Sequence, residues 1–243
     1  MSKVDHGGIM LQIERQEQIL QLLRQKDALR VGQIAKELYT SEATVRRDLA
    51  YMESQGLVRR VYGGVILEKQ NLPLDLRLNE HTAAKKEIAE RAAKLLFEGC
   101  SVFLDASSTA SHLLPYLMEF DHLTVITNSH RAIETLRQSK LNFICTGGRM
   151  IPSNQAYVGP IAEATLENLC VDFAFFSSQG VGEDGEITDF SEEETALRRV
   201  LLKRAKKPVL LCDSSKVGKK YLYRLGNLKD MAAVITDSAF PEI

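Results

Sequence analysis

Two adjacent arginines, Arg46 and Arg47, lie within the stretch TSEATVRRDLAYMESQGLVRR, which covers residues 40–60. A guanidinium group is planar and carries paired donors, so it can bind a phosphate or the edge of a guanine base. The whole chain has a formal net charge of only −1, so this positive charge must act locally. These residue types favour a nucleic-acid contact, although two adjacent arginines alone can also mark an ordinary solvated face.

A helical wheel, advancing about 100° per residue, divides this stretch into two faces. Val45, Leu49 and Met52 fall together and predict a buried stripe. The other side combines small residues near its amino end with arginine one turn later, and its members are Ala43, Thr44, Arg46, Arg47, Ala50 and Tyr51. Such a face can enter the major groove, where Arg47 reaches a guanine edge or a phosphate and Arg46 lies beside the DNA backbone.

The neighbouring elements must hold this helix against DNA. The segments IERQEQILQLLRQ and VGQIAKELY place apolar residues at helical spacing and predict two preceding helices. The hydroxyl group of Thr40 or Ser41 can cap the third helix. The segment LVRRVYGGVIL alternates around Gly63–Gly64, which predicts a hairpin whose Arg59 and Arg60 add a second DNA contact. Three helices and a two-stranded ribbon predict a winged helix-turn-helix, which favours DNA binding over the solvated face.

Polar loops follow six apolar strand candidates in the remainder of the chain. The loop sequences after these strands are DASST, NSH, TGGR, SSQG, DSSK and DSA. The carboxyl ends of parallel strands share one edge of a sheet, so we expect these loops to form a polar pocket. Its hydroxyl groups near helix starts (Ser107, Ser108, Thr109 and Ser129) and its cations (Lys216 and Lys85) suit a phosphate on a small sugar or polyol. The alternative is that these hydroxyls only cap helices.

The composition, 44% hydrophobic and 26% charged, is that of a globular protein with two domains. We predict a mixed α/β chain: a winged helix-turn-helix over residues 1–67, a linker over 68–78, and an α/β domain with a mostly parallel sheet over 79–243. The cysteines are isolated in apolar stretches and predict free thiols in a reducing compartment. No apolar run reaches membrane-spanning length and the first residues lack a signal peptide, so we expect a cytoplasmic protein without a membrane partner.

The segments ERQEQILQLL, SEATVRRDLAYMESQGLVRRVYGGV and LLCDSSKVG resemble the DeoR family of bacterial transcriptional regulators, and the resemblance covers nearly the whole chain. It implies a sensor domain that is similar to the sugar-phosphate isomerase fold and that binds phosphorylated sugars or related metabolites. One departure is Tyr62, where the family more often has histidine.

Two sets of site residues follow from these patterns and from the resemblance. The expected DNA-binding residues are Ser41, Glu42, Ala43, Thr44, Arg46, Arg47, Arg59 and Arg60. The expected effector-binding residues are Arg77, Lys85, Asp105, Ser107, Ser108, Thr109, Asn128, Ser129, Gly147, Gly148, Asp213 and Lys216. The resemblance supplies Arg77, Asp105, the glycine pair and Asp213, and it supports the role of Lys85.

We therefore expect a DNA-binding regulator, a repressor of a sugar or polyol utilisation operon that responds to a phosphorylated sugar. We expect no enzymatic activity and no cofactor. The partners would be double-stranded operator DNA and a second copy of the chain in a dimer or tetramer, because one recognition helix reads too few bases. The alternative is a sugar-phosphate isomerase or deaminase with a DNA-binding head, in which Asp105, Glu194 and Asp213 serve as acid or base. No nucleophile with an adjacent base is visible in support of that alternative.

Three further patterns give weaker indications of function. The segment GVGEDG, residues 180–185, has the glycine spacing of a dinucleotide-binding loop, but its acidic residues would repel a pyrophosphate and no helix is expected after it. Ser191 and Glu194 have capping-box spacing, which predicts a helix start. The histidines lack the spacing of metal ligands, so we expect no metal site.

Overall fold

The computed structural model describes residues 11–26, 28–54, 57–61, 64–67 and 72–237. The chain divides into two compact units, residues 1–72 and 73–243. Of the expected linker, residues 68–71 lie outside the described ranges, and helix α4 (Leu74–Leu78) belongs to the second unit. A helix of a single turn is too short to show a hydrophobic period, so the sequence analysis did not predict it.

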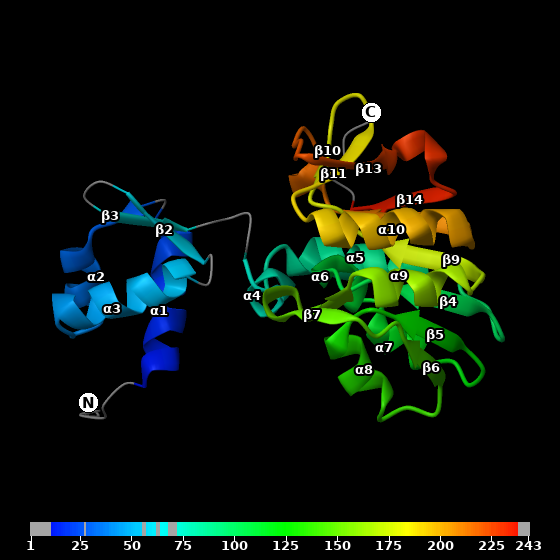
Figure 1. The fold of residues 1–243 in the computed structure, drawn as a ribbon, viewed down its shortest axis with the longest axis horizontal. Coiled ribbons are helices and arrows are strands. Elements are labelled where there is room, and N and C mark those ends of the chain that lie inside the picture. The colour runs from blue at the N-terminus through cyan, green and yellow to red at the C-terminus, as the bar shows by residue number, and fades with distance from the viewer. Residues whose placement is uncertain (1–10, 27, 55–56, 62–63, 68–71, 238–243) are drawn as a thin grey trace. The chain divides into compact units, whose positions relative to one another are not determined.

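The first unit is a winged helix-turn-helix, as the sequence predicts (Figure 1). Its elements are α1 (Gln12–Gln25), β1 (Ala28–Leu29), α2 (Val31–Glu37), α3 (Glu42–Ser54), β2 (Val58–Val61) and β3 (Gly64–Leu67). The three strands form an antiparallel sheet in the order β1-β3-β2. The two-residue strand β1 was not expected.

The wing depends on a close approach of two backbones. A Cβ atom on Gly64 would lie 2.6 Å from the carbonyl oxygen of Leu29, so only glycine lets β3 pair with β1 here. Gly64 is not among the glycines with a positive φ, so the close approach of the backbone, and not the backbone angle, requires glycine here. Tyr62 and Gly63 lie outside the described residues.

The second unit contains a six-stranded sheet in the order β14-β12-β9-β4-β5-β6, with every pair parallel. Its strands are β4 (Ser101–Leu104), β5 (Thr124–Thr127), β6 (Asn142–Cys145), β9 (Val171–Phe176), β12 (Ala205–Cys212) and β14 (Ala233–Thr236). All six correspond to the apolar runs identified in the sequence. Fully buried parallel strands read as continuous apolar runs, which explains why the pattern was clear.

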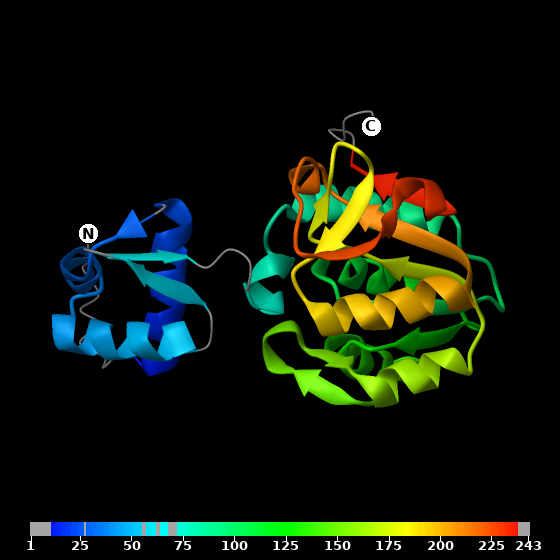
Figure 2. The same cartoon turned by 45° about the horizontal axis from the view of Figure 1, so that its top comes forward.

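Helices cover both faces of this sheet, which makes a three-layer α/β/α unit. One face packs against α5 (Thr82–Ala93), α6 (Ser108–Ser111), α7 (Leu114–Leu117) and α8 (His130–Leu136). The other face packs against α9 (Pro160–Glu167) and α10 (Glu192–Arg204), which lie side by side in Figure 2. Along β4, Val102 and Leu104 join the first core, whereas Phe103 joins the second, because successive side chains of a strand point to opposite faces.

Two small additions flank the main sheet. The hairpin of β7 (Arg149–Ile151) and β8 (Ala156–Val158) precedes α9. A second antiparallel sheet contains β10 (Gly180–Val181), β11 (Glu186–Asp189) and β13 (Tyr223–Asn227). No helix in the described part of the chain is long and apolar enough to cross a bilayer.

The strand order reverses direction at β4, which lies between β5 and β9. After β4 the chain adds β5 and β6 toward one edge of the sheet. The later strands β9, β12 and β14 then extend the sheet toward the other edge. In open α/β sheets the crevice beyond the carboxyl ends at such a point is where ligands bind. The loops after β4 and β9 meet there.

Candidate nucleic-acid interface and anion site

Helix α3 presents the two faces that the helical wheel predicts. Val45, Leu49 and Met52 are buried, and Arg46 and Arg47 are exposed. Ser41 caps the helix, since its Oγ accepts a hydrogen bond of 3.1 Å from the amide of Thr44. Ala43 and Ala50 are exposed on the arginine side, so this surface remains shallow enough to approach a base pair closely.

The exposed arginines of the first unit differ in what they contact. The Arg46 guanidinium lies 3.0 Å from the Glu42 carboxylate, and that of Arg60 lies 2.6 Å from Glu53. The backbone amide of Arg60, followed by its side chain, lowers the pKa of Glu53 and joins the wing to α3. Arg47 has no such partner among the described residues, and Arg59 is exposed on β2.

Asp48 is an acidic residue that the sequence interpretation missed. Its side chain is buried on the core side of α3, and it lies 2.5 Å from the Nε of Arg15 on α1. This hydrogen-bonded pair raises the pKa of Arg15. The contact fixes α3 against α1 and so sets which face of α3 is exposed. On the helical wheel Asp48 falls beside Val45, on the side predicted to be buried, and this position could have identified it.

In the second unit, the loops after three neighbouring strands meet around Lys216. Its Nζ donates to the Oγ of Ser177 after β9 (2.6 Å) and to the Oγ1 of Thr109 after β4 (3.2 Å). It also lies 3.5 Å from Oδ2 of Asp213, which follows β12. Ser177 was not among the expected residues. We refer to Lys85, Thr109, Ser177, Asp213 and Lys216 as the lysine–aspartate cluster.

Asp213 has an open acceptor. The side chain is 1% exposed, and Oδ1 accepts from the amide and hydroxyl of Ser215. Oδ2 is buried and makes no hydrogen bond within the described ranges. Burial alone would raise the pKa of Asp213, but the charge of Lys216 and the bonds from Ser215 outweigh it and lower the pKa. The carboxylate is therefore ionised and can accept a hydrogen bond from a bound molecule.

Lys85, in the first turns of α5, adds a second cation. Only 3% of its surface is exposed, and its Nζ donates to the backbone carbonyl of Arg77 at the end of α4. Burial, together with the positive charge of Lys216, lowers the pKa of Lys85 to about 8. The positive charges of the two ammonium groups repel each other, so an anion bound beside them would be stabilised.

A buried network, which we call the arginine network, lies beside this cluster and consists of Arg198, Asp105, Asp189 and Glu194. The Arg198 guanidinium is 3.1 Å from Asp105, 2.7 Å from Asp189 and 3.5 Å from Glu194. Burial lowers the pKa of Arg198, but these carboxylates raise it more, so the net shift is upward. Asp105 also accepts from the amide of Ser177, 3.2 Å away, so its oxygens hold the loop in place.

Asn154 connects the arginine network to α4, and the sequence interpretation missed it as well. Its Oδ1 accepts from Arg77 at 3.0 Å, and its Nδ2 donates to Glu194 at 2.7 Å. Ser191 caps α10 through the amide of Glu194, as its spacing predicts. The Glu194 side chain points into the interior, where burial raises its pKa.

Other expected residues shape the surrounding loops. Ser107 and Ser129 accept from backbone amides and cap α6 and α8. Asn128 accepts from the amide of Ala106, and so joins the loops after β4 and β5. Gly147–Gly148 have positive φ values of 65° and 107°, and a Cβ on the second would lie 2.6 Å from a backbone oxygen of β8. Close packing after β6 therefore requires glycine at Gly148, whereas the backbone angle favours it at Gly147. Ser108 lies in α6 next to the cluster, and its backbone oxygen contacts the ring of His112.

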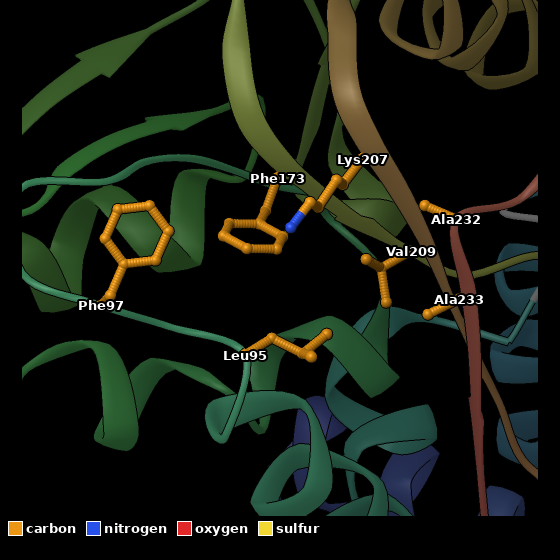
Figure 3. Close-up of a pocket in the computed structure, with 7 residues that line it drawn as sticks. All are labelled: Leu95, Phe97, Phe173, Lys207, Val209, Ala232 and Ala233. Atoms are coloured by element: carbon orange, nitrogen blue, oxygen red, sulfur yellow. The ribbon is translucent and has the colours of Figure 1, made fainter.

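An apolar pocket of about 290 Å³ lies toward the opposite ends of these strands (Figure 3). Its lining residues are Leu95, Phe97, Phe173, Lys207, Val209, Ala232 and Ala233. The Nζ of Lys207 is 5.3 Å from the centre of the Phe173 ring. No member of the lysine–aspartate cluster lines it. Within the described residues, His, Cys, Asp and Glu side chains form no group of three or more that could hold a metal ion.

Comparison with known proteins gives a consistent result for both units. Residues 15–71 match the DeoR-like helix-turn-helix domain, and residues 80–238 match the DeoR C-terminal sensor domain. The L-fucose operon activator of Haemophilus influenzae is 34% identical over 232 residues, covering 94% of this chain and 93% of that protein. GolR, an HTH-type transcriptional regulator of Listeria innocua, is 33% identical over 233 residues, covering 94% and 92%. A ribose 5-phosphate isomerase from Methanocaldococcus jannaschii aligns with 55% of this chain and 53% of its own, at 21% identity and a TM-score of 0.41.

Proposed function

The chain belongs to the DeoR family of DNA-binding transcriptional regulators, and from this premise we propose that it represses a sugar or polyol operon until a phosphorylated sugar or polyol binds its second unit. The exposed face of α3 would read the operator. The lysine–aspartate cluster would bind the effector. The sugar class rests partly on relatives, one of which is named for the L-fucose operon.

The observation that carries the effector proposal is the composition of the lysine–aspartate cluster. Two buried or half-buried ammonium groups, Lys85 and Lys216, suit a phosphate dianion, because charge-assisted hydrogen bonds are strong where water is excluded. The open Oδ2 of Asp213 requires a donor, which a sugar hydroxyl supplies. A phosphorylated polyhydroxy compound satisfies both demands, the first with its phosphate and the second with a hydroxyl group.

The contacts of the acidic residues favour sensing over catalysis. Of the three acid or base candidates of the isomerase alternative, Asp105 and Glu194 are held by Arg198, and Asp213 lies 3.5 Å from Lys216. A carboxylate that is paired with a cation of the same chain is suited to a structural or binding role. We propose that the chain is not an enzyme.

One relative is named an activator, so the sense of control is a separate proposal. We favour release of DNA by the effector, because the Lys85 ammonium is bonded to the carbonyl of Arg77 in α4. A bound phosphate competes for that ammonium. Its binding would therefore loosen α4, the first helix after the DNA-binding unit.

A thermal-shift screen of phosphorylated sugars and polyols tests the effector proposal, with each unphosphorylated parent compound as the control. A ligand that binds only the folded chain stabilises it by about 2.7 kcal/mol at one hundred times its Kd. We expect one phosphorylated compound to raise the melting temperature and its parent compound to have no effect. Lys216→Ala should abolish the increase. Equal shifts from phosphorylated and unphosphorylated compounds, or none from the whole panel, would refute the proposal.

A further inference from the structure

The segment GVGEDG has the glycine spacing of a dinucleotide loop but forms a tight hairpin. Gly180 and Val181 form β10, and the chain turns between Gly182 and Gly185, whose amide donates to the Gly182 carbonyl at 2.9 Å. Strand β11 follows at Glu186, so no helix amino terminus is available for a phosphate. The glycines of this hairpin therefore need another explanation.

Gly180 lies directly against the backbone that follows Lys216. A Cβ atom on Gly180 would be 2.3 Å from the carbonyl oxygen of Lys219 and 2.9 Å from its carbon. The φ of Gly180 is not in the left-handed range, so the close approach, rather than the backbone angle, requires glycine. Backbone atoms cannot rotate away as a side chain can, so any larger residue must displace this segment.

The same hairpin holds the segment at further points. Val181 forms an isolated bridge with Val217, and its carbonyl accepts from the amide of Gly218 at 2.8 Å. The amide of Tyr221 donates to the Oγ1 of Thr188 on β11 at 3.0 Å. These contacts begin one residue after Lys216, so they fix the backbone from which the Lys216 side chain extends.

The loop after β9 thus contacts Lys216 at both ends. Ser177 accepts from the ammonium at 2.6 Å, and Gly180, three residues later, contacts the backbone beyond it. We propose that Gly180 is a positioning residue for the effector site, which sets where the Lys216 ammonium lies. This inference rests on the proposed role of Lys216 in effector binding.

The chain offers a matched control two residues away. A Cβ on Gly182 would meet Cε of Lys220 at 2.4 Å and Oδ1 of Asp184 at 2.5 Å. Both atoms are at the ends of exposed, flexible side chains that can move. Gly182→Ala should therefore leave the segment in place, whereas Gly180→Ala should displace it.

Calorimetric titration of the full chain with inorganic phosphate measures the consequence. We expect Gly180→Ala to weaken phosphate binding about tenfold or more, because a hydrogen bond to a charged group is lost, and Gly182→Ala to bind as the parent does. Thr188→Val removes only the acceptor for Tyr221, and we expect it to weaken binding by about twofold or more. It tests the same segment if Gly180→Ala fails to fold.

Crystal structures of the variants without ligand separate this inference from the proposed function. We expect the contact between Lys216 Nζ and Ser177 Oγ to be lost in Gly180→Ala and kept in Gly182→Ala, a difference that general destabilisation does not produce. An unchanged contact, or parent-like phosphate binding by Gly180→Ala, would overturn the positioning role. Failure of the parent itself to bind phosphate would refute the effector site, and the crystal structures would still decide whether Gly180 positions Lys216.

Discussion

Arg46 and Arg47 are neighbours in sequence but differ in their surroundings. Arg46 is paired with Glu42, which holds its guanidinium toward the amino end of α3, whereas Arg47 has no acidic partner among the described residues. A free guanidinium on the exposed face is suited to a base edge. The Arg46 guanidinium would have to leave the Glu42 carboxylate to bind a phosphate, and this exchange suits a contact with the DNA backbone.

We predict that Arg47→Ala weakens specific operator binding by about 1 to 3 kcal/mol and relaxes discrimination between sequences. Arg46→Ala should weaken binding to all sequences alike and reduce the salt dependence of the affinity. Titrations on operator and scrambled DNA at several salt concentrations measure both effects. If neither variant differs from the parent on either DNA, α3 is not the recognition helix.

Lys85 gives effector binding a pH dependence. A bound phosphate favours the charged ammonium, so binding takes up a proton whenever free Lys85 has lost it, which happens as pH rises through about 8. We predict that effector affinity is about tenfold weaker at pH 9 than at pH 7. Lys85→Arg, which keeps its charge, should flatten the profile. Calorimetry across this pH range tests it, and a flat profile for the parent would contradict it.

The same shift affects stability without ligand. The unfolded chain keeps this lysine protonated up to its ordinary pKa of 10.5, whereas the folded chain releases the proton near 8. Between those values the unfolded state binds more protons, so the contribution of Lys85 makes the free energy of unfolding rise with pH.

The sequence predicts the role of a residue when the contacts of that residue lie close to it along the chain. The exposed face of α3 follows from the helical period alone, and the wheel was correct. Asp105 and Arg198 are 93 positions apart, so nothing near either residue signals their contact. Asn154 and Ser177 are short polar residues in loops, where such residues are common, and only the assembled sheet brings them to the site.

At the scale of elements, the six strands were predictable because burial on both faces makes them continuously apolar. The elements that the sequence analysis did not predict include β1 with two residues, α4 with five, and the antiparallel strands β7, β8, β10, β11 and β13 with two to five. No period can be detected over that length, and tertiary contacts decide their conformation. For α4 those contacts include Lys85 at its carboxyl end and Asn154 at Arg77.

We predict that Asn154→Ala weakens operator binding in the absence of effector and reduces the change that effector causes. The substitution removes the bond that holds Arg77 to α10 through Glu194, so it should loosen α4 as the ligand does. A loss of about fivefold in operator affinity is expected for one lost hydrogen bond to a charged group. Operator titrations with and without effector measure it.

The control for this variant is Asn168→Ala. Asn168 is exposed at the end of α9, and its side-chain amide donates to the carbonyl of Ala164 in that helix. It should behave like the parent. If Asn154→Ala also behaves like the parent, α4 does not transmit the response.

At the scale of the whole molecule, one recognition helix reads too few bases for genomic specificity. We predict a homo-oligomer that binds two half-sites about 34 Å apart, or a multiple of that distance. Light scattering at micromolar concentration measures the mass. A monomer that binds operator with full affinity would contradict this prediction.

We place the two proposed functions in different units, so the effector would act by favouring one arrangement of the DNA-binding units in the proposed oligomer. The central claim is that the lysine–aspartate cluster senses the effector and that this sensing releases DNA. Operator binding by Lys85→Ala, Asp213→Ala and Lys216→Ala, with and without the compound found in the thermal screen, tests it most directly. We predict that Asp213→Ala and Lys216→Ala bind operator as the parent does but no longer release it when the effector is added. Lys85→Ala also loses its bond to α4, so it should bind operator more weakly and not respond to the effector. Release by these variants at the same effector concentration as the parent would show that the effector binds elsewhere.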